Sequence, residues 1–353
     1  MTGKTVWLDV LTPKQALLMH YLSLKLRSKG YETIITCRKY DYIESLLKGY
    51  EEKFVSIGEH GGRSLSRKLA AYAKRTLELT KLINEVSPSV LISYPSPSGC
   101  RVAFGLGIPI ILMNDTPHAE AVNKLTIPLA NYLIFSKCIP LEAFKPYTLP
   151  GTKIYQFNGV DELEWVINYK PPKQFKERAL SLINLDKPFI IFRPEETQAS
   201  YYKYRPVFHK VLKYIASRFD GTIVFLPRYE YQRKHVLKRF KNIIVPETAL
   251  DLRVLYPKAS LVITGGATIA REAALMGTPS ISYFPRKTLV NECVSSWGFP
   301  LYNTHDWVSL RKHINTLLEE RTRLNENQLR KIYLQLEKPS TAVIKALEEL
   351  NSG

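Results

Sequence analysis

The segment Leu261–Pro279 contains the residues of this chain whose types and spacing are best suited to binding a ligand. Its sequence, LVITGGATIAREAALMGTP, predicts a buried strand, a turn at Gly265 and Gly266, and a helix with Glu272 about two turns in. Glycines let backbone N–H groups approach an anion, and the helix start adds the positive end of its dipole. A carboxylate in that helix can accept hydrogen bonds from a ribose diol. The pattern favours a nucleotide site, although many strand–glycine–helix junctions bind nothing.

In this segment the chain resembles GT-B glycosyltransferases of the MurG type and the non-hydrolysing UDP-GlcNAc 2-epimerases. It is more similar still to a largely archaeal family related to both, known as domain of unknown function 354. In those relatives the glycines hold the diphosphate and the helix glutamate holds the uridine ribose. The resemblance assigns diphosphate binding to Gly265 and Gly266, with Ala267 and Thr268 beside them, and ribose binding to Glu272. It implies a GT-B-like α/β fold: two Rossmann-like domains with parallel sheets facing a central cleft, and a C-terminal helix returning to the first domain.

A second group of ionisable residues follows the predicted strand Ile110–Met113. Asn114, Asp115 and His118 lie between that strand and the next helix. Ligands gather at the carboxyl ends of strands in open α/β sheets, so we expect Asp115 or His118 to act as a general base or to orient a substrate. Asp115 could instead cap the helix, with His118 in its first turn. The related family also has a polar Asn-Asp-x-x-His segment here, which favours the functional interpretation.

Further polar residues follow other predicted strands. The hydroxyls of Ser96 and Ser98 could hold a sugar or phosphate, or Ser98 could simply cap the next helix. Lys14 follows the first strand, at a turn where many GT-B enzymes carry a Gly-Gly-His sequence that is missing here. We therefore include Lys14, Ser96, Ser98 and Asn114 as candidate contacts to an acceptor or sugar.

Two arginines follow strands of the second half. Arg193 would emerge at the end of strand Phe189–Phe192, where its guanidinium matches the oxygens of a diphosphate. Arg228 follows strand Thr222–Leu226, and the resemblance places this position near the nucleobase. The epimerases carry a catalytic His in the loop after the first of these strands, and residues 194–202 contain none. That difference disfavours 2-epimerisation. Surface salt bridging is the alternative role for both loops.

The chain is strongly basic. Its 353 residues include 50 Lys and Arg against 32 Asp and Glu, which gives a formal net charge of +18. Such a charge attracts polyanions, including nucleotide-sugar diphosphates and anionic lipid surfaces. No nucleic-acid-binding motif is recognisable, so nucleic acid is not an expected partner. A nucleotide sugar is the expected partner, and a lipid-linked acceptor at a membrane surface is a further candidate.

Several classes of protein and site do not match the sequence. No apolar run approaches the roughly 20 residues that cross a bilayer, and the N-terminus leads directly into a predicted strand without a signal peptide. The cysteines form no Cys-x-x-Cys pair, and there is no Asp-x-Asp motif or Walker loop. We therefore expect a cytoplasmic protein, with peripheral membrane attachment as an option, and no metal or cofactor. The sequence does not indicate an oligomeric state.

Alternating strands and helices divide the chain into two halves, each typical of a parallel, doubly wound sheet. The expected strands are Thr5–Leu11, Thr33–Cys37, Lys53–Ile57, Val90–Ser93, Ile110–Met113, Tyr132–Phe135, Ile154–Phe157, Phe189–Phe192, Thr222–Leu226, Ile243–Val245, Leu261–Thr264 and Ser280–Phe284. The pattern loosens over Asn158–Lys187, which we interpret as the domain connection. We expect an acceptor domain over 1–165, a donor domain over 175–338 and a C-terminal helix over 339–353 that packs back on the first domain. A further helix is expected near Leu250–Pro257.

The long helix predicted over Ser64–Val86 is amphipathic and basic. Leu65, Leu69, Leu79 and Ile83 share one face at about 100° per residue, and most of its basic residues lie elsewhere. We expect this apolar face to pack on the core. A helix that lies on a membrane surface has the same pattern, so that alternative stays open.

These features together predict a metal-independent glycosyltransferase that uses a nucleotide sugar, with a uridine diphosphate as the expected nucleotide. A UDP-sugar 2-epimerase or hydrolase is the nearest alternative. A non-catalytic basic protein that binds a polyanion or a membrane on the same scaffold is the third hypothesis.

Overall fold

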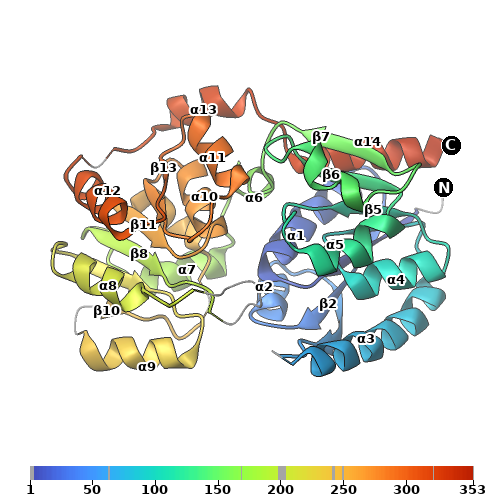
Figure 1. The fold of residues 1–353 in the computed structure, drawn as a ribbon, viewed down its shortest axis with the longest axis horizontal. Coiled ribbons are helices and arrows are strands. Elements are labelled where there is room, and N and C mark those ends of the chain that lie inside the picture. The colour runs from blue at the N-terminus through green and yellow to red at the C-terminus, as the bar shows by residue number, and fades with distance from the viewer. Residues whose placement is uncertain are drawn as a thin grey trace. The chain divides into compact units, whose positions relative to one another are not determined.

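The computed structural model describes residues 4–62, 64–167, 169–197, 204–240, 243–248, 250–320 and 322–352. The chain divides into two compact units, which Figure 1 colours in chain order. Unit 1 comprises Met1–Trp165 together with Leu336–Gly353, and unit 2 comprises Val166–Gln335. Each unit is an α/β structure built on one parallel sheet.

The sheet of unit 1 has seven strands in the order β3-β2-β1-β4-β5-β6-β7, and its pairs are parallel. The strands are β1 (Thr5–Val10), β2 (Glu32–Lys39), β3 (Phe54–Glu59), β4 (Val90–Ser93), β5 (Ile110–Met113), β6 (Tyr132–Ser136) and β7 (Lys153–Phe157). Strands β4 and β5 are buried along their whole length because apolar runs such as these need cover on both faces.

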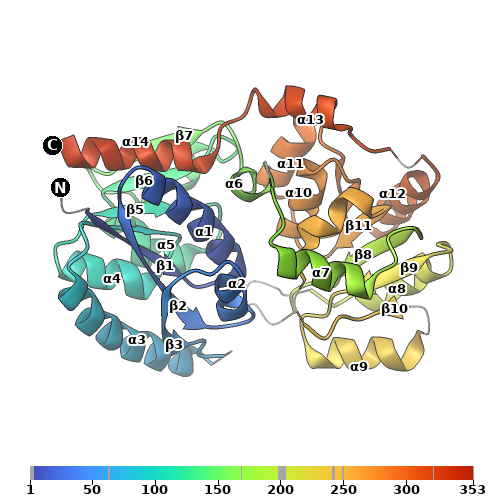
Figure 2. The ribbon, with the colours of Figure 1, turned by 180° about the vertical axis from the view of Figure 1, so that it is seen from behind.

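Helices cover both faces of this sheet. They are α1 (Pro13–Ser28), α2 (Ile43–Gly49), α3 (Leu65–Val86), α4 (Pro97–Gly105), α5 (Glu120–Thr126), the short α6 (Leu163–Val166) and α14 (Pro339–Ser352). α1, α2 and α14 lie on one face, as Figure 2 shows, and α14 packs on β6 and β7. α3, α4 and α5 form a layer on the other face, because right-handed crossovers that run in opposite directions from β1 place their helices on opposite faces.

The sheet of unit 2 has six strands in the order β10-β9-β8-β11-β12-β13, again with parallel pairs. The strands are β8 (Phe189–Arg193), β9 (Thr222–Phe225), β10 (Ile243–Ile244), β11 (Leu261–Thr264), β12 (Ser280–Ser282) and β13 (Leu301–Asn303). The helices are α7 (Lys173–Leu182), α8 (Phe208–Ala216), α9 (Glu230–Arg239), α10 (Thr268–Leu275), α11 (Leu289–Ser296), α12 (Trp307–Glu320) and α13 (Glu326–Tyr333). α8, α9 and α12 contribute to the apolar core on one face, and α7 and α10 to the core on the other.

The structure confirms the expected strands and corrects several helices. The expected helix near Leu250–Pro257 is instead two 3-10 turns, Leu252–Val254 and Tyr256–Lys258, because Pro257 cannot donate the backbone hydrogen bond that a continuous helix needs. Helix α7 forms inside the segment interpreted as a connection, directly after Pro172, and buries Phe175. Strand β13 was not expected from the sequence. No helix in the described part of the chain has the length and apolar character of a membrane span.

The prediction that one apolar face of α3 packs on the core is wrong for its first turns. Leu79 and Ile83 are buried as expected, together with Arg75, but Leu65 and Leu69 are exposed. The reason is length. A helix of 22 residues extends about 33 Å, whereas β3 and β4, the strands that α3 connects, have six and four residues and extend about 20 Å at most. The N-terminal part of α3 therefore has less sheet to cover.

The segment after β7 is bonded to the segment that leads into α14. The Glu337 N–H donates to the carbonyl of Asn158 over 2.7 Å, and the Asn158 N–H donates to Glu337 Oε2 over 2.7 Å. Gly159 lies so close to the Glu337 carbonyl that a Cβ there would overlap it. The Ser340 N–H donates to Glu164 Oε2, so the start of α14 is anchored to unit 1 at several points.

Candidate functional site

Four polar side chains of unit 1 meet at the carboxyl ends of four different strands. The Lys14 ammonium forms an ion pair with Asp115 and lies 2.7 Å from Asp161 Oδ2 and 3.2 Å from the Tyr94 hydroxyl. That hydroxyl in turn donates to Asp161 Oδ2. Lys14 follows β1, Tyr94 follows β4, Asp115 follows β5 and Asp161 follows β7. We name these four residues the acid–base cluster.

The turn between β1 and α1 places Lys14 in this cluster. Thr12 is the N-cap of α1 and Pro13 occupies its first turn, where the fixed φ of proline suits the start of a helix. Gln15 folds back so that its Oε1 accepts from the Leu11 N–H over 2.6 Å. With its neighbours held in this way, the Lys14 side chain extends from the first turn of α1 toward the ends of the strands.

Asp115 is positioned by two asparagines. Asn114 is buried and its Oδ1 accepts from the Thr116 N–H over 2.8 Å, while its Nδ2 donates to Asn123 Oδ1 over 2.9 Å. Asn123 donates back to the carbonyls of Thr116 and Pro117. The turn after β5 is thus tied to α5, and the part-buried Asp115 side chain projects toward Lys14. Asn114 has a supporting role here and does not present its amide to a ligand.

The alternative role of Asp115 as a helix cap does not occur, since the N-cap of α5 is Ala119. His118 lies on the turn before α5 and is exposed. The acid–base cluster therefore makes Asp115 the stronger candidate of the two for proton transfer.

Burial and like charges shift two pKa values in the cluster. The pKa of Asp161 is raised, first by burial and then by the neighbouring carboxylates Asp115 and Glu162, although the Lys14 ammonium opposes the shift. Burial also raises the pKa of the Tyr94 hydroxyl well above its usual range, with Asp115 and Asp161 adding to the effect. Raised pKa values that come from burial and neighbouring like charges are typical of functional sites.

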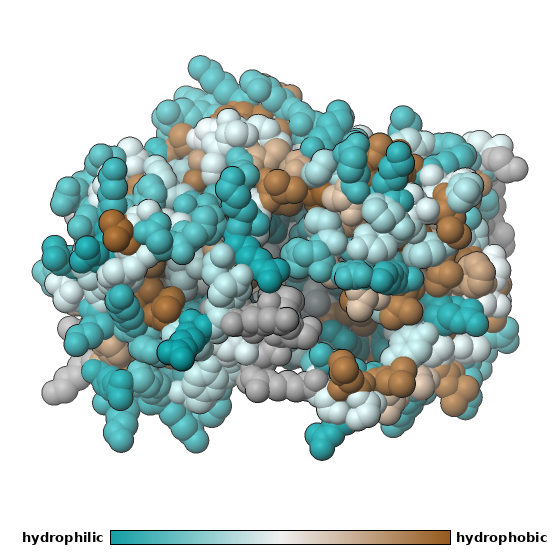
Figure 3. Space-filling model, viewed as in Figure 1, coloured by the Kyte–Doolittle hydropathy of each residue, from teal (hydrophilic) through white to brown (hydrophobic). Residues whose placement is uncertain are grey.

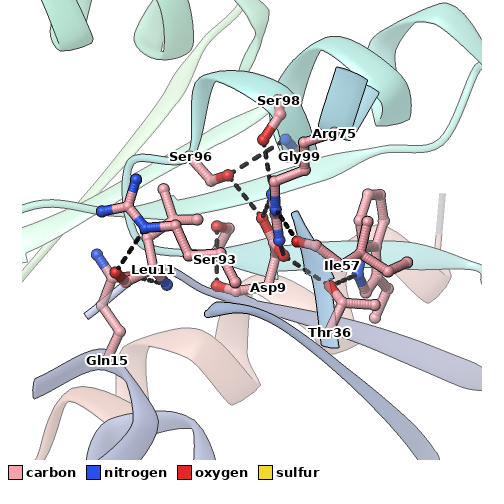
Figure 4. A network of polar contacts seen from close by, with 12 residues as sticks. Asp9, Leu11, Gln15, Thr36, Ile57, Arg75, Ser93, Ser96, Ser98 and Gly99 are labelled. Atoms are coloured by element: carbon pink, nitrogen blue, oxygen red, sulfur yellow. Dashed lines mark hydrogen bonds and ion pairs between the residues drawn. The ribbon is translucent and has the colours of Figure 1, made fainter. Parts of the chain in front are cut away.

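A second polar network of unit 1 is fully buried, and Figure 4 shows its bonds. Arg75 of α3 donates from Nη2 to Asp9 Oδ1 over 2.6 Å and from Nη1 to Asp9 Oδ2 over 3.1 Å. Asp9 also accepts from the hydroxyls of Thr36 and Ser96, each over 2.6 Å. The Arg75 guanidinium holds the pKa of Asp9 below its ordinary value even though burial acts in the opposite direction. Arg75 Nη1 further donates to Ser98 Oγ over 2.6 Å.

This network corrects the roles expected for Ser96 and Ser98. The N-cap of α4 is Ser96, whose hydroxyl accepts from the Gly99 N–H, and Ser98 lies in the first turn. Both side chains are buried and bonded to Asp9 or Arg75, so neither hydroxyl is presented to a sugar. The Asp9 carboxylate approaches the start of α4 so closely that a Cβ on Gly99 would lie 2.6 Å from its Oδ2.

In unit 2, the Gly265-Gly266 turn connects β11 to α10 beside the end of β8. The Gly265 N–H donates to the carbonyl of Arg193 over 3.0 Å, and the Gly266 N–H donates to Thr264 Oγ1 over 3.0 Å. A Cβ on Gly265 would lie 2.6 Å from the backbone of Glu195, so glycine is needed there for packing. These two N–H groups are therefore used within the protein.

The start of α10 is the part of this turn that can bind an anion. Ala267 is the N-cap and no side chain caps the helix, so the N–H groups of the first turn, which begins at Thr268, have no acceptor within the helix. Arg193 ends β8 directly beside Thr264 in the sheet. Its Nε is buried and has no hydrogen-bond partner among the residues that the structure describes.

Arg228 lies over the same turn. Its Nε donates to the carbonyl of Pro194 over 3.1 Å, and a Cβ on Gly266 would lie 3.2 Å from its Nη2. Glu196 is 3.7 Å from Arg228 Nη1 and accepts from the Tyr229 hydroxyl, which fixes the loop after β9. The structure therefore brings together Arg193, Arg228 and the start of α10. The rest of the loop after β8, residues 198–203, lies outside the described residues.

Glu272 is the fifth residue of α10, which places it little more than one turn from the start of the helix and closer than expected. It is buried, and its Oε2 accepts from the Tyr256 hydroxyl over 2.9 Å. Tyr256 is itself fully buried, and its carbonyl accepts from Thr278 Oγ1 over 2.5 Å. The carboxylate is thus held in one orientation beside the first turn.

Sequence reasoning missed three residues of these sites. Asp161 follows the seventh strand, β7, in a part of the chain that was interpreted as a connection. Searching the residues after β7, as was done for the other strands, would have found Asp161. Tyr94 directly follows β4, so the same search of strand ends would have found it. Tyr256 precedes Glu272 by sixteen residues, and no local signal connects the two.

Comparison with known proteins places the chain in a family. The family described as protein of unknown function (DUF354) matches residues 4–345. The chain belongs to the DUF354 family. This DUF354 chain is also 33% identical to an uncharacterized protein of Methanocaldococcus jannaschii, over 82% of its own length and 84% of that protein.

Solved structures share its fold at low identity. The UDP-GlcNAc 2-epimerase of M. jannaschii has a TM-score of 0.67 at 16% identity and covers 94% of the DUF354 chain and 99% of its own. The UDP-GlcNAc 2-epimerase of Neisseria meningitidis bound to UDP-GlcNAc has a TM-score of 0.64 at 16% identity, covering 98% and 100%. A spinosyn forosaminyltransferase has a TM-score of 0.62 at 15% identity and covers 100% of both chains. The fold is GT-B-like, the fold of these nucleotide-sugar enzymes.

Proposed function

We propose that this protein is a metal-independent glycosyltransferase that uses a UDP-sugar, and that unit 2 holds this donor. The observation that carries the proposal is the convergence of Arg193, Arg228 and the first turn of α10, with the oriented carboxylate of Glu272 one turn further along. Two guanidinium groups and a helix start form a cation-rich cradle for a diphosphate. A buried carboxylate beside it suits a ribose diol.

The relatives support the choice of nucleotide. Structures with the same fold include an epimerase bound to UDP-GlcNAc and another in complex with UDP-GlcNAc and UDP. The resemblance of the Gly265-Gly266 segment to their donor-binding motif adds to this. In the proposed complex Arg193, Arg228 and the start of α10 contact the diphosphate, and Glu272 accepts from the ribose hydroxyls.

The acid–base cluster suits the proton transfer of glycosyl transfer. As the acceptor oxygen forms its bond to the anomeric carbon, its proton passes to Asp115, and the bond from that carbon to the diphosphate oxygen breaks with its electron pair going to UDP. Arg193 and the helix dipole stabilise the charge that develops on the leaving diphosphate. Lys14 holds Asp115 in place and balances the charge of the carboxylate pair.

One observation favours a second candidate, a UDP-sugar 2-epimerase or hydrolase. The cluster holds two carboxylates and a tyrosine around Lys14, whereas transfer needs only one base. Two carboxylates beside one substrate can remove a proton from it and return one. Incubation of UDP-GlcNAc without any acceptor separates the candidates: a 2-epimer or free sugar among the products would replace the transferase proposal.

Nucleotide binding tests the donor site. We expect UDP to bind more tightly than ADP or GDP in calorimetric titration, and Glu272→Ala to weaken UDP binding about 10- to 100-fold, because two charge-assisted hydrogen bonds to the ribose are lost. Glu247→Ala, which removes an exposed carboxylate of the same unit, is the matched control and should bind like the wild type. Equal affinity for all three nucleotides, or wild-type affinity in Glu272→Ala, would contradict the proposal.

The pH dependence of turnover tests the cluster. Because the pKa of Asp161 is raised above its ordinary 3.8, this carboxylate takes up a proton at a higher pH than an exposed aspartate. We expect kcat/KM to fall on the acid side as pH drops through this raised value, since protonation removes one of the two charges that hold Lys14. Asp161→Asn should abolish that acid limb. An unchanged acid limb in Asp161→Asn would assign it to another group.

A further inference from the structure

The α3–α5 layer of unit 1 exposes large apolar side chains. Leu65, Leu69 and Leu77 of α3 are 81%, 67% and 61% exposed, and Phe104 of α4 and Leu125 of α5 are each 56% exposed. α3 packs beside α4, and α4 beside α5, so these side chains belong to one layer. Single exposed leucines are common on soluble proteins, but five on three adjacent helices indicate an interaction surface.

The fold of unit 1 does not need these side chains. The side chains of α3 that face the core are those of Arg75, Leu79 and Ile83, which are buried. Leu65 and Leu69 lie in the first turns, where the helix has less sheet to cover. Polar residues at these positions would leave the described core unchanged.

Basic side chains accompany the apolar ones. The three helices carry seven Lys and Arg against three Glu: Arg67, Lys68, Lys74, Arg75, Lys81, Arg101 and Lys124 against Glu78, Glu85 and Glu120. Arg75 is paired internally with Asp9, and Lys124 with Glu120. From Leu65 to Leu77, α3 contains no acidic residue. Figure 3 shows brown apolar groups among teal polar groups on this face of unit 1.

We propose that this surface docks unit 1 on an anionic lipid bilayer. Leu65, Leu69 and Phe104 would enter the boundary between headgroups and acyl chains, while Lys74 and Arg101 contact lipid phosphates. An apolar face flanked by Lys and Arg is the arrangement that binds the interface of anionic membranes, where each basic residue adds to the attraction. This inference rests on unit 1 alone and does not depend on the proposed nucleotide site.

Charge complementarity favours a bilayer over other occupants. A second copy of the chain docked through the same surface would bring like charges together, since a two-fold interface places a patch against itself. Single-stranded nucleic acid is bound by aromatic rings on which bases stack, and this surface presents mainly leucine. An anionic bilayer matches both the apolar and the basic component.

Co-sedimentation with vesicles tests the inference. The full chain should sediment with vesicles of phosphatidylcholine and phosphatidylglycerol at low salt, and at least tenfold less with phosphatidylcholine alone. Leu65→Ser combined with Leu69→Ser should lower the partition coefficient at least tenfold, because both side chains leave the interface. Lys68→Gln combined with Lys74→Gln should lower it to a similar extent and reduce its dependence on salt.

The matched control is Leu237→Ser, which replaces a leucine of α9 in unit 2 that is 53% exposed, and which should bind vesicles like the wild type. Circular dichroism and thermal unfolding of each variant check that the fold is retained. The inference is overturned if the wild type does not sediment with anionic vesicles at low salt. It is equally overturned if the folded Leu65→Ser, Leu69→Ser variant binds as the wild type does.

Discussion

Replacing Lys14 with Met should lower kcat about 1,000-fold and leave UDP affinity unchanged. Lys14 is the cation that contacts Asp115, Asp161 and Tyr94 together. Without it, two neighbouring carboxylates lose their counter-charge, so one of them takes up a proton and the other loses the orientation in which it accepts one. General base catalysis contributes about 10²- to 10⁴-fold to enzymatic rates, which sets the expected size of the loss.

The measurement is steady-state release of UDP from the sugar nucleotide that calorimetry identifies, followed in parallel with UDP binding. Lys14→Arg keeps the charge but replaces a compact ammonium with a planar guanidinium, so partial activity is expected. Lys124→Met removes an exposed lysine paired to Glu120 on α5 and serves as the control that should retain full activity. A Lys14→Met protein with wild-type turnover would show that the cluster is structural only. Loss of UDP binding in the same variant would instead place Lys14 in nucleotide binding.

Replacing Arg75 with Met should destabilise unit 1 by about 3–5 kcal/mol. The change leaves the fully buried Asp9 carboxylate with two hydroxyl donors but without its ion-pair partner. Removing one partner of a buried ion pair is strongly destabilising because it leaves a buried charge without its pair. It also removes the donors to the Ile57 carbonyl and Ser98, which join α3 to β3 and α4. Urea unfolding followed by circular dichroism measures the loss.

A second substitution separates the charge effect from lost packing. Asp9→Leu together with Arg75→Met removes both charges, so we expect the double variant to be more stable than Arg75→Met alone. Arg67→Met changes an exposed arginine on the same helix and should alter the free energy of unfolding by less than about 0.5 kcal/mol. If Arg75→Met unfolds at the wild-type urea concentration, the buried pair is not a main support of unit 1.

The sequence predicts the strands of this protein well because their signal is local. Runs such as Ile110–Met113 and Leu261–Thr264 are apolar throughout, which is what a strand covered on both faces requires. Candidate site residues were found where they lie at or within four residues of the end of such runs, as Lys14, Asp115 and Arg193 do. Asp161 follows a strand as well, but it was hidden by the irregular segment that contains it.

Long-range pairing has no local signal. Arg75 is one of several basic residues on α3, and nothing in its neighbourhood shows that it pairs with Asp9, 66 positions away. Capping of the helix was one of two roles considered for Ser98, and Ser96 is the residue that caps it, because both hydroxyls suit that role and the choice depends on where Asp9 and Arg75 lie. Leu65 and Leu69 show the reverse case, since a local pattern predicted burial and the length of the sheet prevents it.

The return of α14 to unit 1 makes the order of synthesis differ from the order of folding. Residues 166–335 of unit 2 are contiguous and are complete on the ribosome before the last helix of unit 1 is made. Until then, β6 and β7 lack the helix whose Val343, Ala346 and Leu347 are buried in unit 1. The larger part of unit 1 is synthesised first, yet unit 1 as a whole is completed last. A nascent chain therefore exposes an apolar strand surface until the final segment has been translated and α14 covers it.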